Sequence, residues 1–193
     1  MRFDPVVTHT MVNAETEIDV ATVVFRHDQH DRQTLAIFAR ELADSGCRIG
    51  GMVQEVFFDD QGRRTHIDSV DLATGDRVTI NQPSRTRPDG TGCTLDTAAL
   101  ADAGAPLRRA LTDRPDLVIV EKYSEQEQSG AGLLDEILSI IAAGLPTLVL
   151  VPEPALASWR ELTGGEAVEL QCEAEALRHW WRDRSTGVEP ITE

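Results

Sequence analysis

The chain has 193 residues, of which 41% are hydrophobic and 26% are charged, a composition that excludes wholesale disorder. Its 33 acidic residues outnumber its 18 basic ones, and the net charge of -15 disfavours generic binding to nucleic acids and to anionic membrane surfaces. No run approaches the roughly 18 apolar residues of a membrane span. Acidic residues also interrupt the N-terminal stretch where a signal peptide would be apolar. We therefore predict a cytoplasmic protein with neither a membrane nor a nucleic-acid partner.

The cysteines also indicate the type of cell compartment. Cys47, Cys93 and Cys172 are odd in number, lie far apart and form no CxxC pair. This pattern favours a reducing compartment over a zinc cage or a disulfide framework.

The first predicted elements are a strand and a helix. Residues 1–18 show no clear period and are predicted to form an extended arm or an edge strand. The apolar run ATVVF at 21–25 is typical of a buried parallel strand. A helix is then predicted from Asp31, with Gly46 at its C-terminal cap. Its apolar residues recur at helical spacing: Leu35, Phe38 and Leu42.

Three extended runs with short turns between them follow, at 47–58, 66–72 and 77–80. They predict an antiparallel meander inserted early in the domain. Residues 81–95 are rich in Pro, Gly, Ser and Thr and predict a functional or mobile loop. Asp96 can cap the helix after this loop.

The second half of the chain alternates between strands and helices. Pro106 breaks one helix or begins the next, because it suits the first turn. DLVIV at 116–120 and TLVLV at 147–151 predict two more buried parallel strands. The remaining predictions are a polar loop at 121–130, helices at 133–143, 155–162 and 173–183, and a strand at 167–170.

These elements predict an α/β fold with a mainly parallel sheet, helices on both of its faces, and the antiparallel meander. The predicted organisation is an N-terminal arm at 1–18, a single domain at 19–185 and a flexible tail at 186–193. Ligands of open parallel sheets bind at the carboxyl ends of the strands. The loops after the three apolar strands therefore mark the expected site.

Three segments carry a resemblance to a known family: GGMVQEVFFDDQGRRTHIDSVDLATGDRV, GCTLDTAAL and DLVIVEKYSEQEQSG. Their order resembles the small nucleoside triphosphatases first known from thermophiles, and a related bacterial family of unknown function, over about residues 20–165. The resemblance implies a three-layer P-loop-NTPase-like fold in which ATVVF and DLVIV are close parallel neighbours. Relatives of the unknown-function family accompany molybdate uptake or molybdenum-enzyme genes, which implies oxyanion handling.

The phosphate-binding loop of that fold is degenerate in this chain. Active members carry GxxxxGK[ST] after the first strand, because backbone N–H groups of a Gly-rich turn wrap the phosphates. This chain has FRHDQHDRQT instead, with no glycine between Arg26 and Gln33. Arg32 stands near the position of the lysine and could contact an anion, but it does not restore the loop.

The second nucleotide motif is also altered. The family places an acid at the end of the strand and then a glutamate, whereas this chain has Glu121 and Lys122. Glu121 could hold a metal-bound water, but Lys122 cannot act as an anionic base. Glu127 matches a further family glutamate, and it is either functional or an acid favoured by a helix N-terminus. We expect Glu121, Lys122 and Glu127 to share one cleft facing Arg32.

Several other residues are candidates for binding. His27 and His30, with Glu121, could bind a metal, although the loop spacing of the two histidines is common. Other candidates could line the same mouth if the 81–95 loop folds over it, although surface turn chemistry explains them more simply: Asp71, Thr74, Gln82, Arg85 and Cys93. The tryptophans could be interface anchors or fill the core: Trp159, Trp180 and Trp181.

Three functional hypotheses remain open. The first is a catalytically degenerate P-loop-like protein that binds a small anion, a nucleotide or a protein partner, with magnesium present only if a nucleotide is bound. The second is a nucleoside triphosphatase with an unconventional phosphate site built from Arg32, Lys122 and Glu121. The third is a scaffold or subunit that binds another protein or a second copy of itself.

Overall fold

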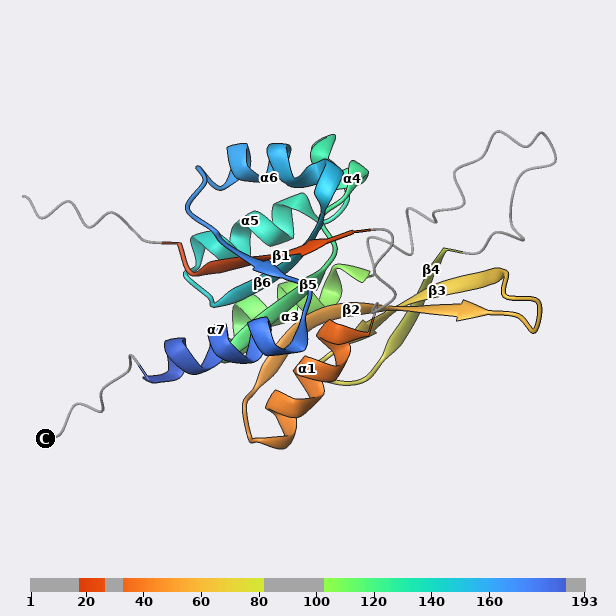
Figure 1. Cartoon of the computed structure of the whole chain (residues 1–193), viewed down its shortest axis with the longest axis horizontal. Helices are drawn as coiled ribbons and strands as arrows, with labels where there is room; N and C mark the ends of the chain where they lie inside the picture. The colour runs from red at the N-terminus through yellow and green to blue at the C-terminus, as the bar shows by residue number, and fades with distance from the viewer. Residues whose placement is uncertain (1–17, 27–32, 82–102, 187–193) are drawn as a thin grey trace, which may run out of the picture.

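A mixed β-sheet forms the centre of the molecule (Figure 1). The structure is a computed structural model and describes residues 18–26, 33–81 and 103–186. Within these ranges seven strands form one sheet in the order β4-β3-β2-β5-β6-β1-β7. The strands are β1 (Val20–Phe25), β2 (Ile49–Phe58), β3 (Arg64–Asp71), β4 (Arg77–Asn81), β5 (Leu117–Glu121), β6 (Thr147–Pro152) and β7 (Val168–Gln171).

The sheet has a parallel part and an antiparallel part. Strands β2, β5, β6, β1 and β7 pair in parallel, whereas β3 pairs antiparallel with both β2 and β4. The predicted antiparallel meander is therefore confirmed. Strands β1 and β5 run parallel as expected, but β6 lies between them and pairs with both.

Helices cover both faces of this sheet. One face packs against α1 (Thr34–Asp44) and α7 (Ala174–Thr186). The other packs against α3 (Ala105–Asp113), α5 (Leu134–Ala142) and α6 (Leu156–Leu162). Two short elements complete the described part: α4 (Glu125–Gln128) and the 3-10 turn η2 (Glu153–Ala155). The result is a three-layer α/β domain, as predicted.

Strand β5 shows why the apolar runs have no polar alternation. Leu117 and Ile119 pack toward α1 and α7, whereas Val118 and Val120 pack toward α3 and α5. Successive side chains of a strand point to opposite faces, so a strand covered on both sides must be apolar throughout. All four side chains are fully buried.

Glycine is required where β2 meets β5. Gly51 has a φ of +92°, and a Cβ added there would lie 2.0 Å from the carbonyl oxygen of Ile119. A side chain would therefore collide with the backbone of β5, which cannot move without breaking the sheet.

Some local predictions need correction. Glu121 is the last residue of β5 rather than the start of a loop, and α4 lies within the predicted 121–130 loop. Trp159 is no interface anchor, because it is 1% exposed and its Nε1 donates to Thr22 Oγ1 at 2.7 Å. Ile18, assigned to the arm, packs on the core, and α7 continues to Thr186. No helix among the described residues is long and apolar enough to cross a membrane.

Candidate functional site

Two cavities lie at the carboxyl edge of the parallel strands. Their volumes are about 130 Å³ and 220 Å³, and five residues line both: Gln54, Arg64, Ile67, Glu121 and Lys122. The smaller cavity also touches Phe25, the last residue of β1, and Leu35 at the start of α1. The larger one reaches Glu127 and Leu133 before α5. We call the two together the carboxyl-edge cleft.

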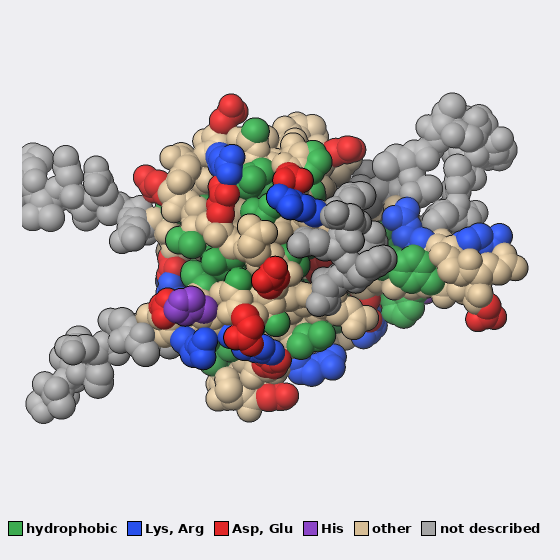
Figure 2. Space-filling view, in the orientation of Figure 1, with side chains coloured by type: hydrophobic (Ala, Val, Ile, Leu, Met, Phe, Trp, Pro, Cys, Tyr) green, Lys and Arg blue, Asp and Glu red, His purple; other side chains and the backbone are tan. Residues whose placement is uncertain are grey.

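The β2–β3 hairpin forms one wall of this cleft. Strand β2 pairs with β5 over Ile49–Met52, but it continues to Phe58 while paired with β3. The hairpin therefore projects beyond the end of β5 (Figure 1). Basic side chains gather on the projecting part (Figure 2). Because the hairpin overhangs the edge, it brings residues of β3 to the end of β5.

Glu121 is the buried acid of the cleft. Its side chain lies at the end of β5 and is 7% exposed. The backbone N–H of Gln54 donates to Glu121 Oε2 at 3.1 Å. The carboxylate is therefore held in place by β2, and the Glu121–Lys122 peptide bond that follows is cis.

Two cationic side chains accompany this acid. Lys122 is half-buried, and Arg64 on β3 is exposed and forms no ion pair with any described residue. With Glu121 and Glu127, these side chains make the charges that line the cleft balance, in a chain whose net charge is -15. Paired cations at a cavity mouth favour a small anion.

Glu127 is engaged in organising the loop after β5. It is 4% exposed, and its Oε2 accepts from the backbone N–H of Ser124 at 2.9 Å and from Ser124 Oγ at 3.0 Å. Its Oε1 accepts from the N–H of Leu133 at 3.1 Å. These contacts form a capping box on α4 and tie it to the start of α5. Gly132 makes room for the carboxylate, because a Cβ there would lie 2.2 Å from Oε1.

The predicted site residues divide into three groups. Glu121, Lys122 and Glu127 line one cavity, as the positions of the loops suggested. Asp71 and Thr74 do not line the cleft. Asp71 pairs with Arg109, and Thr74 lies in the turn after β3. Both are therefore at the end of β3 opposite to Arg64, which is its first residue. The remaining candidates lie outside the described residues: His27, His30, Arg32, Gln82, Arg85 and Cys93.

Sequence reasoning missed Arg64 and Gln54. The run at 47–58 is much longer than DLVIV at 116–120, and that mismatch is the signal that could have found them. A strand longer than its parallel neighbour must project past one end of it, and its hairpin partner then lines that end. For metals, no group of three or more suitable side chains occurs among the described residues.

Two solved structures share this arrangement of strands and helices. The solution structure of a human cancer-related nucleoside triphosphatase has a TM-score of 0.60 and 18% identity, covering 90% of this chain and 99% of that one. The crystal structure of THEP1 from the hyperthermophile Aquifex aeolicus has a TM-score of 0.57 and 17% identity, covering 88% and 99%. The chain therefore has a P-loop-NTPase-like fold.

A curated relative shares more of the sequence. Molybdenum import ATP-binding protein ModC 2 of Bradyrhizobium diazoefficiens is 39% identical over an alignment of 183 residues, and the match covers 92% of this chain. The match covers 20% of that protein, so the chain spans about a fifth of its length.

The family described as "Protein of unknown function (DUF2478)" matches residues 20–180, from the first residue of β1 to the middle of α7. This range includes every strand of the sheet and the whole carboxyl-edge cleft. The chain therefore belongs to the DUF2478 family.

Proposed function

We propose that this chain is a cytoplasmic P-loop-like protein that binds a small anion or a nucleotide in the carboxyl-edge cleft and does not hydrolyse nucleotides efficiently. The observation that carries the proposal is the position of Lys122 and Arg64 around the buried Glu121, at the strand ends where this kind of fold binds ligands. The two cations attract an anion, and the carboxylate of Glu121 repels the charged part of that anion from the end of β5.

The sequence supports binding without turnover. Residues 26–33 lack the glycines needed for close approach of backbone N–H groups to phosphates. Lys122 also stands where an anionic group would orient the attacking water. Magnesium enters this proposal only with a nucleotide, and Glu121 is then the group that would hold a metal-bound water. Arg32, His27 and His30 stay candidates for binding the same anion, and they lie outside the described residues.

The relative ModC 2 supports molybdate handling or its regulation as the setting. Molybdate is a small tetrahedral oxyanion, and a cleft with two cations suits its charge. We therefore place molybdate first among the anions to be tested and the Mg-nucleotides second.

A protein-partner role is the second candidate. The region of ModC 2 that is 39% identical to this chain is a fifth of that protein. This observation favours a subunit or scaffold that works beside further protein domains, including a second copy of this chain.

Calorimetric titration tests the anion proposal. The purified chain is titrated with molybdate, inorganic phosphate, MgADP and MgATP, and we expect saturable binding of at least one of them. Arg64→Ala and Lys122→Ala should each weaken it about tenfold, the usual effect of removing a charge-assisted contact. Arg63→Ala is the matched control, because Arg63 pairs with Asp59 and does not line the cleft.

Two outcomes contradict this proposal. One is the absence of binding for all four ligands, which leaves the partner role. The other is an equal loss of affinity in Arg63→Ala and Arg64→Ala, which would make the attraction a general charge effect. For turnover, phosphate release from MgATP or MgGTP should stay at the background rate. Robust release that disappears in Glu121→Gln would establish the triphosphatase hypothesis instead.

A further inference from the structure

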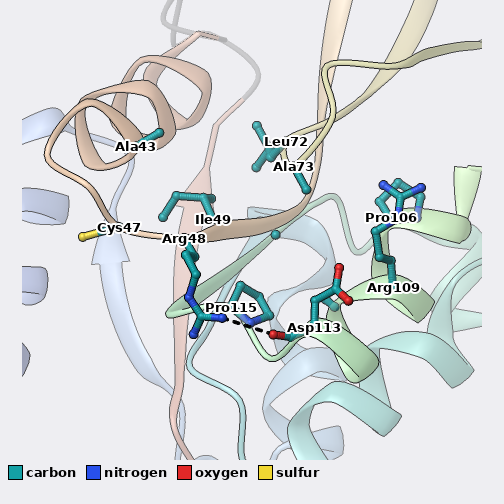
Figure 3. Close-up of a pocket in the computed structure, with 12 residues that line it drawn as sticks. Ala43, Cys47, Arg48, Ile49, Leu72, Ala73, Pro106, Arg109, Asp113 and Pro115 are labelled. Atoms are coloured by element: carbon teal, nitrogen blue, oxygen red, sulfur yellow. Dashed lines mark hydrogen bonds between the residues drawn. The ribbon is translucent and has the colours of Figure 1, made fainter.

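A larger cavity lies at the opposite edge of the same strands (Figure 3). Its volume is about 340 Å³. It is lined by the end of α1, the start of β2, the turn after β3 and one side of α3. We call it the amino-edge cavity, because β2 and β5 both begin beside it while the carboxyl-edge cleft lies at their other ends. None of its lining residues belongs to that cleft.

Its walls are mostly apolar. The volume lies at the lower end of the range of small-molecule sites, about 300–1,000 Å³, which typically combine apolar walls with a few polar groups. The apolar residues that line it are Ala43, Ile49, Leu72, Ala73, Pro106, Ala110 and Pro115.

Both arginines of the cavity are already neutralised. Arg109 Nη1 forms an ion pair with Asp71, whose side chain is 6% exposed. Arg48 Nη2 donates to Asp116 Oδ1 at 3.1 Å and to the carbonyl oxygen of Arg114 at 2.9 Å. Its Nη1 donates to the carbonyl oxygen of Asp113 at 3.3 Å. Neither guanidinium is therefore available as a full positive charge for an anionic ligand.

The carboxylate of Asp113 is the unbalanced charge. It forms no hydrogen bond or ion pair with any described residue. Figure 3 shows it pointing away from Arg48, toward the space between Ala73 and Arg109. Asp113 is also the last residue of α3, and the C-terminal end of a helix carries partial negative charge. With Arg109 and Arg48 offset by Asp71 and Asp116, the cavity has a net charge of about -1.

We propose that the amino-edge cavity is a second ligand site that takes a small organic cation, an amine with an apolar body. The ammonium group lies at Asp113, and the body packs against Ile49, Leu72 and Pro115. The apolar walls account for the body and the unbalanced carboxylate accounts for the charge. The negative net charge of the chain also attracts cations and so raises their concentration near the protein.

A matched series of ligands tests the charge and the place together. Two-dimensional ¹⁵N–¹H spectra of the full chain are recorded during titration with n-hexylamine, n-hexanoate and 1-hexanol, which share one body. We expect saturable shifts for the amine at Leu72, Ala73, Ala110 and Asp113, with about fivefold tighter binding than for either comparator. Binding of hexanoate as tight as that of the amine overturns the proposal, as does an amine titration with no saturable shift at those residues.

Two variants and a control locate the site. Asp113→Asn should weaken amine binding about fivefold and leave hexanol binding unchanged, because it removes the charge and keeps the shape. Ala43→Leu should abolish amine binding by filling the cavity from an exposed helix position. Asp60→Asn is the control, because Asp60 is an exposed acid in the β2–β3 turn. Equal weakening by Asp60→Asn and Asp113→Asn contradicts the proposal.

Folding of each variant is checked by its thermal midpoint. If Asp113→Asn or Ala43→Leu has the thermal midpoint of the wild type and still binds the amine with unchanged affinity, the proposed site is also contradicted. Because the two sites share no residue, failure here leaves the anion proposal standing, and the reverse holds as well.

Discussion

The two ends of β2 and β5 differ in character although the same two strands build both. At the amino end the strands begin together, with Ile49 opposite Leu117, and helix ends pack around an apolar cavity. At the carboxyl end β2 continues past β5 and its hairpin brings Arg64 to Glu121 and Lys122. The contrast shows that strand length decides which segments meet at each end of these strands: helix ends at the amino end, and the β2–β3 hairpin at the carboxyl end.

The largest expected effect is on the free energy of unfolding, through the close approach of β2 to β5 between their two ends. Gly51→Ala should lower the free energy of unfolding by roughly 3 kcal/mol or more, because the new Cβ would lie 2.0 Å from the Ile119 carbonyl oxygen. Gly62→Ala is the control, since Gly62 also has a positive φ but nothing within 4 Å of its Cβ position. It should cost about 1 kcal/mol. Urea titration measures both, and equal losses would show that β2 can move away from β5.

Glu127 tests whether the loop at the carboxyl end depends on a buried carboxylate. Glu127→Gln places an amide donor against either the Ser124 or the Leu133 donors, so unfolding should become easier by about 1–3 kcal/mol. Glu125→Gln changes an exposed acid of the same short helix and should stay within about 0.5 kcal/mol. Urea titration measures both. A Glu127→Gln variant that is as stable as wild type but loses anion binding would instead give Glu127 a direct functional role.

A crossed experiment sharpens the comparison of the two ends. The double variant Arg64→Ala/Lys122→Ala should reduce anion affinity by more than about tenfold and leave n-hexylamine affinity within about twofold. Asp113→Asn should show the opposite pattern. Calorimetry with both ligands on both variants measures this. A loss of both affinities in either variant would mean that the ends are coupled, contrary to two independent sites.

The smallest expected effect concerns pH at the amino end. The backbone N–H and the guanidinium of Arg48 hold the pKa of Asp116 below its ordinary value of 3.8. A carboxyl with a lowered pKa in the folded state stabilises the fold above its unfolded pKa, and this stabilisation is lost as the pH falls toward the folded pKa.

Asp116→Asn should therefore be less stable than wild type at pH 7, by at most about 1 kcal/mol because the pair is exposed, and the gap should shrink below about pH 4. Urea titrations at pH 7, 5 and 3.5 measure it. A gap that widens at low pH would contradict this assignment.

Much of the architecture was predictable because its signals are local. The runs ATVVF, DLVIV and TLVLV form strands β1, β5 and β6 within a residue or two, since a strand covered on both faces must be apolar throughout. Gly46 has a positive φ of +94° after α1, and Pro106 lies in the first turn of α3. Each of these depends on the conformational preferences of one residue or one short segment.

Parts of the site were not predictable because they depend on contacts between distant segments. The sequence indicated that Glu121, Lys122 and Glu127 would meet, since they follow one strand. It did not indicate that Arg64, 57 positions before Glu121, would join them across the hairpin. It left Asp71 and Thr74 with two interpretations, the mouth of the site and surface turns, and the structure places both away from the cleft because strand pairing sets the direction of each meander strand relative to β5.

The sequence by itself determined the three-layer α/β class and the order of the main strands and helices, and it shows no glycine between Arg26 and Gln33 and a lysine at position 122. These follow from local periodicity, turn residues and motif chemistry, which a linear chain displays directly. The tertiary structure alone decided that β6 separates β1 from β5, that the β2–β3 hairpin overhangs the carboxyl edge, and that Asp113 is left without a described partner while Arg48 and Arg109 are paired. The reason is physical: strand register and ion pairing depend on which distant segments share a surface, and the energies that choose among those pairings belong to the packed chain as a whole.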